Sequence, residues 1–370
     1  MPESPDELTE IATRHQVYLE GLKTHETKKA QKFLKDIDRV LAARLATKDL
    51  TTFSRNKLER LLKSVKADLR IIASNYSDMV SGESVDIAKY ERDFEIKSLN
   101  KVVAYDFAVP ASAQLRSAVF TNPLTMAGAD NGKMLKPFLK DMSNRSMQQI
   151  GGIIQAGYYE GQTTPQILKT IRGTRAAKYT DGAMHRINRS LSVATRTAVQ
   201  HAAVQAREQV WQDNKDIVKK VRWVSTLDGR TSAVCRSLDG REFPIDKGIR
   251  PPAHPNCRST IVAVLDSRFD ALDRGATRKA RSYNAKGDST GVISVPAKET
   301  YYSWLKRQPA KFQSSVIGEN RARLLRNGGM SAERFSELQL SKDFKELTLA
   351  DLHQLEPKAF EKADVTKFID

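Results

Sequence analysis

Cysteine is scarce in this chain: its 370 residues contain only Cys235 and Cys257. A framework of disulfide bonds is therefore excluded as the source of the fold, and both thiols are expected to be reduced or bound to metal. Long apolar runs are also absent, because no stretch approaches the roughly 18 residues that a membrane helix needs. The acidic N-terminus MPESPDELTE lacks the basic and then apolar order of a signal peptide. The sequence predicts a protein of the cytoplasm, or of a particle assembled there.

Internal repeats and low-complexity segments are absent too, and 40% apolar with 28% charged residues indicates a globular chain. The first hundred residues have almost no excess charge, since 18 Lys and Arg face 17 Asp and Glu. Residues 101–370 hold the remaining 43 basic and 27 acidic residues, which is nearly all of the net charge of +17. This asymmetry favours a polyanion partner for the second part and a structural or protein-facing role for the first. The alternative is solubility charge on an enzyme with an anionic substrate.

Apolar residues recur at helical spacing in the first hundred residues. They are Phe33, Leu34, Ile37, Val40, Leu41 and Leu45 before a break near Leu50, and Leu58, Leu61, Leu62, Val65 and Leu69 after it. The pattern predicts two antiparallel helices, whose apolar stripes pack on each other or on another chain. Pro110 and Pro123 then interrupt the pattern, and we expect a domain boundary there.

The middle of the chain predicts further helices. One ends at Gly161, and Thr164 with Pro165 gives the next an N-cap and first turn. A long helix is expected from about Met184 to Trp211, with His201 on its apolar face as a core histidine or a ligand. On another face, three arginines share nearly the same angle, a stripe that either follows a phosphate backbone or is solvated or ion-paired. They are Arg189, Arg196 and Arg207.

The segment from Trp223 to Val264 concentrates the chemistry of the chain. It predicts a small, loop-rich β element with short strands at its two ends and turns at Asp228-Gly229 and Asp239-Gly240. Cys235, His254 and Cys257 are residue types that bind zinc, so one zinc ion is the candidate cofactor. Asp228 or His201 is the candidate fourth ligand; alternatively the thiols and the ring pack without metal. A Cys-His nucleophilic pair and a zinc nuclease are the enzymatic alternatives.

Several residues of this segment, in fixed order over about forty positions, resemble the Mu F-like family of phage head morphogenesis proteins. They are Trp223, Asp228, Arg230, Thr231, Cys235, Gly240, Pro252, His254, Asn256, Cys257 and Arg258. Gly161 to Ile167, Thr195 to Thr197, Trp304, Gly318, Arg321 and Leu347 to Leu349 extend the resemblance outward. Ala198 and Ser259 depart from it, where many members have Glu and a further Cys.

The resemblance implies a minor head protein of a tailed phage, without enzymatic activity. Such a protein is associated with the portal and the head interior and acts in head assembly and in genome packaging or delivery. The implied partners are the portal protein, double-stranded DNA, and the scaffold or major capsid protein, with no membrane in the assembled head. The implied location is the virion, after assembly in the host cytoplasm. The competing hypotheses are a zinc-dependent nuclease or other hydrolase built on the Cys/His motif, and a host-type nucleic-acid-binding protein.

After Val264 the chain is rich in basic residues, glycine and serine, which predicts a flexible connector that neutralises phosphates without reading sequence. Its candidate DNA contacts are Arg274, Arg278, Lys279, Arg281 and Lys286. Helices resume near Tyr301, and Thr348 to Asp351 has the form of a capping box. The expected fold is therefore α+β and mainly α-helical. The expected parts are a helical region (1–105), a head morphogenesis domain (106–265), a basic connector (266–300) and a helical tail (301–370).

Overall fold

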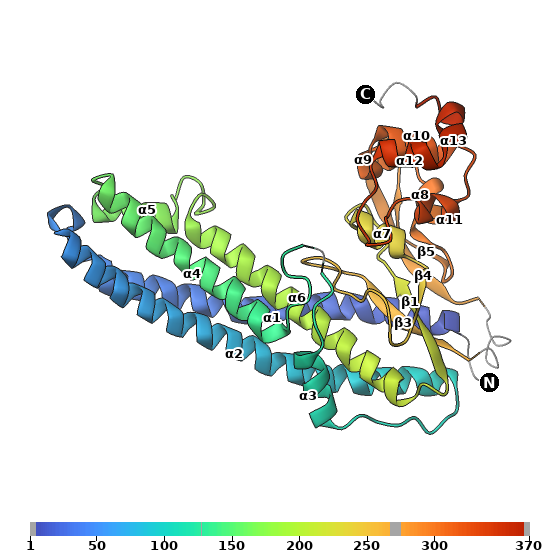
Figure 1. Cartoon of the computed structure of the whole chain (residues 1–370), viewed down its shortest axis with the longest axis horizontal. Coiled ribbons are helices and arrows are strands. Elements are labelled where there is room, and N and C mark those ends of the chain that lie inside the picture. The colour runs from blue at the N-terminus through green and yellow to red at the C-terminus, as the bar shows by residue number, and fades with distance from the viewer. Residues whose placement is uncertain (1–4, 127, 267–274, 366–370) are drawn as a thin grey trace.

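A computed structural model of the chain describes residues 5–126, 128–266 and 275–365 (Figure 1). The helices are α1 (Pro5–Leu45), α2 (Arg55–Val102), α3 (Ser112–Thr121), α4 (Leu135–Tyr159), α5 (Thr164–Arg172), α6 (Ala183–Asp213), α7 (Ala233–Leu238), α8 (Tyr301–Lys306), α9 (Ala310–Ile317), α10 (Glu319–Asn327), α11 (Ala332–Glu337), α12 (Leu349–Leu355) and α13 (Pro357–Ala363). The strands are β1 (Val218–Val224), β2 (Glu242–Pro244), β3 (Thr260–Leu265), β4 (Thr277–Tyr283) and β5 (Ser289–Pro296). This confirms the expected α+β, mainly helical fold. In the described part of the chain, no helix is long and apolar enough to cross a membrane.

The helices α1 and α2 form an antiparallel hairpin, as the two apolar stripes predict. A short 3-10 helix, Leu50–Thr52, separates them, and Asp49 caps it by accepting a hydrogen bond from the Thr51 backbone. Ion pairs between Lys29 and Glu83 and between Arg44 and Asp68 join the outer faces of the two helices. The apolar stripes are buried inside the molecule rather than left open for another chain.

The hairpin does not form a core by itself. One continuous cluster of buried residues runs from Leu19 in α1 to Ala206 in α6 and includes α2, α3, α4 and α5. Figure 1 shows α1, α2, α4 and α6 running side by side along the long axis. At the far end from the strands, the N-cap of α5 is Thr163, one residue before the predicted Thr164. The buried Thr164 instead donates a hydrogen bond to the Lys48 carbonyl, at 2.5 Å, and ties α5 to the end of α1.

A three-stranded antiparallel sheet follows α6, in the order β2, β1, β3. Both strands predicted for this segment are present within β1 and β3. The inward residues Val221, Trp223 and Ile261 are fully buried in a second core, which also receives Leu99 of α2. The sheet is thereby packed against the helical bundle, at the end opposite the turn between α1 and α2 (Figure 1).

Residues 277–296 form a β-hairpin, β4 and β5, where a flexible connector was expected. The backbone alternation places Arg278 and Ala280 inward and Lys279 and Arg281 outward, so Arg278 is not available to solvent. The turn is closed by the Gly287 backbone N–H, which donates to the Asn284 carbonyl at 2.8 Å, with Gly287 at φ +88°. The connector prediction was therefore wrong for these residues.

The C-terminal helices α8 to α13 lie above the sheet in Figure 1 and enclose a third core. Its largest fully buried side chains are Tyr301, Trp304, Phe335 and Phe360. The capping box predicted at Thr348 is present, because Asp351 accepts from the Thr348 backbone and side chain. This tail is docked on the β element, since Ser336 donates a hydrogen bond to the Ser237 carbonyl at the end of α7.

Candidate functional site

Cys235, His254 and Cys257 converge at one point, although Cys235 comes from helix α7 and the other two come from the loop before β3. Cys235 lies in the first turn of α7, which Ser232 caps. His254 and Cys257 follow the cis bond between Pro251 and Pro252. The Cys235 Sγ lies 3.7 Å from the Cys257 Sγ and 3.2 Å from the His254 Nε2, and the three ligand atoms lie within 4.8 Å of one another. Both thiols are buried, with 1% of each residue exposed.

The two thiols have opposite acidities. Burial raises the pKa of Cys235 well above its ordinary value, and the neighbouring Cys257 adds to the rise. Burial also opposes ionisation of Cys257, but its contacts with Cys235 and His254 hold the pKa of Cys257 well below the ordinary value. The same contact raises the pKa of His254 despite its burial. Of the two thiols, Cys257 is the one whose ionised form its neighbours favour.

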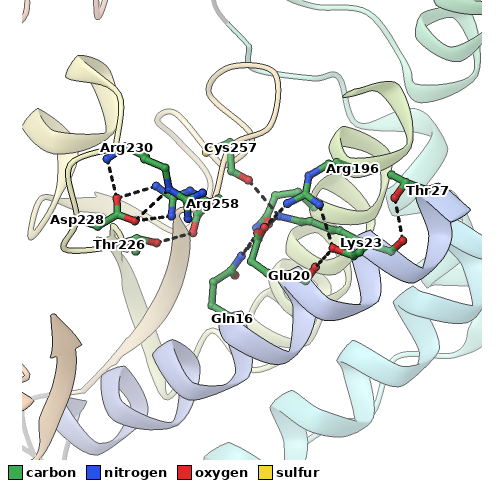
Figure 2. Close-up of polar contacts among 12 residues, drawn as sticks. Gln16, Glu20, Lys23, Thr27, Arg196, Thr226, Asp228, Arg230, Cys257 and Arg258 are labelled. Carbon is green, nitrogen blue, oxygen red and sulfur yellow. Dashed lines mark hydrogen bonds and ion pairs between the residues drawn. The ribbon is translucent and has the colours of Figure 1, made fainter. Parts of the chain in front are cut away.

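Asp228, a predicted fourth metal ligand, is not part of this cluster. Its carboxylate accepts two hydrogen bonds from the Arg258 guanidinium, at 2.7 and 2.8 Å, as Figure 2 shows. It also accepts from the Arg230 backbone at 3.0 Å and from the Thr231 hydroxyl at 3.2 Å. Despite desolvation, these donors keep the pKa of Asp228 below its ordinary value. The carboxylate instead links the two loops that carry the cysteines.

His201, the other candidate for the fourth position, is a core histidine. Its Nε2 lies 3.0 Å from the Val119 carbonyl, in α3, and the side chain is buried. Burial lowers the pKa of His201 to about 4, so the ring is neutral at physiological pH. Of the two alternatives for this residue, the hydrogen-bonded core histidine is the one observed.

The other motif residues shape the backbone around the cluster. Trp223 is buried in β1 and donates its indole N–H to the Ser225 hydroxyl, which in turn donates to the Cys235 carbonyl. Gly240 turns with φ +83° and donates to the Trp223 carbonyl at 2.9 Å. A side chain there would lie 2.8 Å from the Thr300 methyl group. Asn256 takes a left-handed conformation, φ +59°, between the two ligand residues His254 and Cys257.

Two arginines predicted to contact DNA are buried in ion pairs. The Arg207 side chain is 1% exposed, with its Nε 3.4 Å from Glu91 Oε2 and its Nη1 donating to the Thr260 hydroxyl. The Arg278 side chain is 3% exposed and pairs with Asp239, which also accepts from the Ser225 backbone. Both predictions were wrong, because a guanidinium inside the protein does not reach a phosphate outside it.

The remaining predicted DNA contacts lie at the surface or outside the described residues. Arg189, Lys279, Arg281 and Lys286 are exposed. Arg196 is partly buried and pairs with Glu20, so its charge is already matched. Arg274 falls outside the described residues.

A polar network between α1 and the motif loop was missed by sequence reasoning (Figure 2). Lys23 of α1 is 1% exposed and donates to Glu20, to Gln200 and to the Cys257 carbonyl at 3.0 Å. Gln200 of α6 donates to the Ser259 carbonyl at 3.0 Å. Burial lowers the pKa of Lys23, and the nearby Glu20 opposes that shift. The signal in the sequence was weak: polar residues such as Lys23 and Gln200 lie on helices whose other inward residues are mostly apolar.

The arrangement of the cluster favours binding over catalysis. The His254 ring contacts the Pro255 carbonyl through Nδ1, at 2.8 Å, rather than a carboxylate. The described part of the chain places no Asp or Glu in the Cys/His group. A nucleophilic Cys-His pair needs an accessible thiol and an oriented base, and both Cys235 and Cys257 are buried.

Residues 148–262 match the model of a family described as Phage Mu protein F like protein. The match begins in α4 and ends in β3, so it includes the Cys/His cluster. The β-hairpin β4–β5 and the C-terminal helices lie beyond it. The resemblance inferred from the motif residues is thereby confirmed. No curated protein and no solved structure matches the chain. The family suggests a phage head morphogenesis protein, of a structural rather than an enzymatic class.

Proposed function

We propose that the protein is a minor head protein of a tailed phage that associates with the portal and the head interior. In this role it acts in head assembly and in packaging or delivery of the genome, and it binds double-stranded DNA without reading sequence. The family match supports the head assembly part. A group of exposed, unpaired cations between α5 and α6 supports the DNA-binding part.

These cations lie at the end of the helical bundle that carries α5 (Figure 1). Residues 169–189 contain six Lys or Arg and one Asp. The aspartate is occupied, because Asp181 accepts from the backbone and side chain of Thr174 at 2.8 and 2.7 Å. Arg172 pairs with Asp38 of α1. The other five cations of residues 169–189 are exposed and form no ion pair with a described carboxylate. They are Lys169, Arg175, Lys178, Arg186 and Arg189.

The loop that carries two of these cations, residues 173–182, has a fixed shape. Lys178 and Tyr179 both take left-handed backbone conformations, at φ 50° and 61°. Such conformations are costly outside glycine and persist where surrounding contacts enforce them. Tyr179 is 56% exposed. A preorganised loop of cations with an exposed aromatic side chain loses little conformational entropy when it meets a phosphate backbone.

The outer face of the hairpin β4–β5 is a second basic surface, with Lys279, Arg281 and Lys286 exposed. The Lys279 ammonium donates to the Ser294 hydroxyl and the Arg281 guanidinium to the Ser289 hydroxyl. It lies beside the sheet, whereas the 173–182 loop lies at the opposite end of the bundle (Figure 1). Two separated basic surfaces suit a polyanion that is long compared with the protein.

The test neutralises the first surface in the full chain. We expect Arg175→Ser, Lys178→Ser, Arg186→Ser and Arg189→Ser together to weaken binding to a random-sequence duplex. The slope of log affinity against log salt should become shallower by about 0.9 for each phosphate that the variant no longer neutralises. Fluorescence anisotropy over a salt series measures both quantities.

The control removes the same charge elsewhere, by Arg39→Ser, Arg55→Ser, Arg60→Ser and Lys63→Ser on exposed positions of α1 and α2. This variant should keep the wild-type slope. Equal reductions in both variants would mean that net charge alone attracts DNA, and the assignment of the surface would fail. An absence of wild-type binding at low salt would remove DNA binding from the proposal.

Portal association has its own test. The full chain and the portal protein of the same phage should co-purify in the absence of DNA. Heads assembled without this chain should contain less genome or deliver it less well. Normal heads without it would contradict the assembly role.

A further inference from the structure

We propose that Cys235, His254 and Cys257 bind one zinc ion, with solvent as the fourth ligand. This inference goes beyond the proposed function, because it holds whether or not the protein contacts DNA or the portal.

The three ligand atoms lie within 4.8 Å of one another, close enough for one ion to reach all of them. Zinc lies about 2.3 Å from a thiolate and about 2.0 Å from an imidazole nitrogen, which separates two sulfur ligands by about 3.8 Å and a sulfur from a nitrogen by about 3.6 Å. The observed separations are 3.7 Å between the two Sγ atoms and 3.2 Å from Cys235 Sγ to His254 Nε2. The distance between the two sulfurs already fits the tetrahedral value, and the imidazole has to move to reach an ion between them.

The surroundings orient the ligands toward a common point. The His254 Nδ1 lies 2.8 Å from the Pro255 carbonyl, so it donates there in the neutral ring and leaves the Nε2 lone pair facing the sulfurs. The backbone N–H of Cys257 donates to the His254 carbonyl, which closes the loop between the two ligands. Two softly polarisable sulfurs and one imidazole are the donor set that zinc prefers over magnesium or calcium.

The fourth position faces a small polar cavity. No other Cys, His, Asp or Glu of the described residues joins the group. A cavity of about 20 Å³ lies against Cys235 and His254 and is also lined by Asn256 and Ser232. That volume holds one water molecule, and the polar lining supplies hydrogen-bond partners for it.

The site explains how two polar loops hold their shape. Residues 239–252 include only a three-residue strand, β2, and no helix. A metal at their ends links α7 to the loop that carries His254 and Cys257. The Cys257 carbonyl also accepts a hydrogen bond from Lys23 of α1. The loop that carries His254 and Cys257 is therefore also bonded to α1.

Metal content of the full chain tests the proposal. Protein purified under reducing conditions without chelator should contain about one zinc per chain by elemental analysis. Removal by chelator should lower Tm, and added zinc should restore it. Cobalt(II) added to the metal-free protein should give the absorption bands of a tetrahedral ion with thiolate ligands. These measurements on the unmodified chain do not depend on any variant folding.

Substitutions then assign the ligands. Cys235→Ser and Cys257→Ser should each reduce zinc from about one equivalent to near zero. The matched control is Ser237→Ala, on α7 two residues after Cys235, which removes a hydroxyl that donates to the Ala233 carbonyl and no ligand, and should keep its zinc. A wild-type chain that binds neither zinc nor cobalt(II) would overturn the proposal. So would full zinc in both cysteine variants, or a thiol titration showing that the native protein holds a Cys235–Cys257 disulfide.

Discussion

Buried charges join elements that are distant in the chain. Glu91 of α2 lies between His15 of α1, at 2.7 Å, and Arg207 of α6, at 3.4 Å. One turn further along α2, Glu95 accepts from the indole N–H of Trp211 at 2.7 Å. Each of these groups is almost fully removed from water. These two carboxylates therefore join α1, α2 and α6 in the interior of the bundle.

Glu95 should make stability depend on pH near neutrality. Burial raises the pKa of Glu95 from 4.5 to about 7, Arg207 and Trp211 oppose the rise, and Glu91 adds to it. The folded protein thus holds a proton that the unfolded chain releases at lower pH, so this group's contribution to stability falls as pH rises from about 4.5 to 7. Glu95→Gln keeps an acceptor for Trp211 and cannot ionise. We expect a higher free energy of unfolding than wild type at pH 8 and a smaller difference at pH 5, by urea denaturation.

The control for this prediction is Glu59→Gln, at an exposed position of α2 whose side chain is 58% accessible. It should leave the pH profile unchanged. A wild-type profile that matches that of Glu95→Gln from pH 5 to 8 would contradict the assigned ionisation.

Residue roles were predictable where the signal is local. The order of Cys235, His254 and Cys257 indicated a convergent cluster, and the structure brings the three together. Arg207 and Arg278 were misassigned because their partners, Glu91 and Asp239, are 116 and 39 positions away, and a charge pattern does not show which face is covered. The basic surface around the loop 173–182 was overlooked, although the six cations and single aspartate of residues 169–189 were visible in the sequence.

At the scale of elements, apolar periodicity predicted the long helices α1, α2 and α6, whereas α3, α7 and the hairpin β4–β5 were not expected. Strand β5 contains Val292, Ile293 and Val295, a β-branched pattern that favours a strand. The neighbouring strand β4 is mostly basic and polar. Its inward residue Arg278 is charged, so the sequence shows no alternation of apolar and polar residues there. The residues of β4 alternate between buried and exposed only because this strand pairs with β5. The sequence of one strand does not show which strand it pairs with.

The contact of α1 with the motif loop gives a prediction at this scale. Lys23→Met removes a buried donor that serves Glu20, Gln200 and the Cys257 carbonyl, and leaves that carbonyl without its partner. We expect the free energy of unfolding to fall by about 1 to 3 kcal/mol. Lys29→Met on the same helix is the matched control, because Lys29 is 38% exposed and its surface pairs are worth at most about 1 kcal/mol. Equal destabilisation of the two variants would show that the network does not hold α1.

At the scale of the whole molecule, the expected division near residue 105 crosses a continuous core. Residues of α1 and α2 share one buried cluster with α4 and α6. A chain that begins at residue 103 should expose Ile150, Ala194 and Ala198, among others, and should not unfold cooperatively by circular dichroism. Cooperative unfolding of that fragment would instead establish the first hundred residues as a separate unit. Local periodicity predicted the long helices α1, α2 and α6, but which helices share a core depends on packing across the chain.

The bond from Lys23 to the Cys257 carbonyl joins residues 234 positions apart. A ribosome adds roughly 5 to 20 residues per second, so the two partners are made roughly 10 to 50 s apart. For that time the nascent α1 has neither its sheet nor its motif loop to pack against. The last step that fixes this helix therefore comes late in synthesis, and we expect the N-terminal hairpin to rely on holding chaperones until the ribosome has passed the second cysteine.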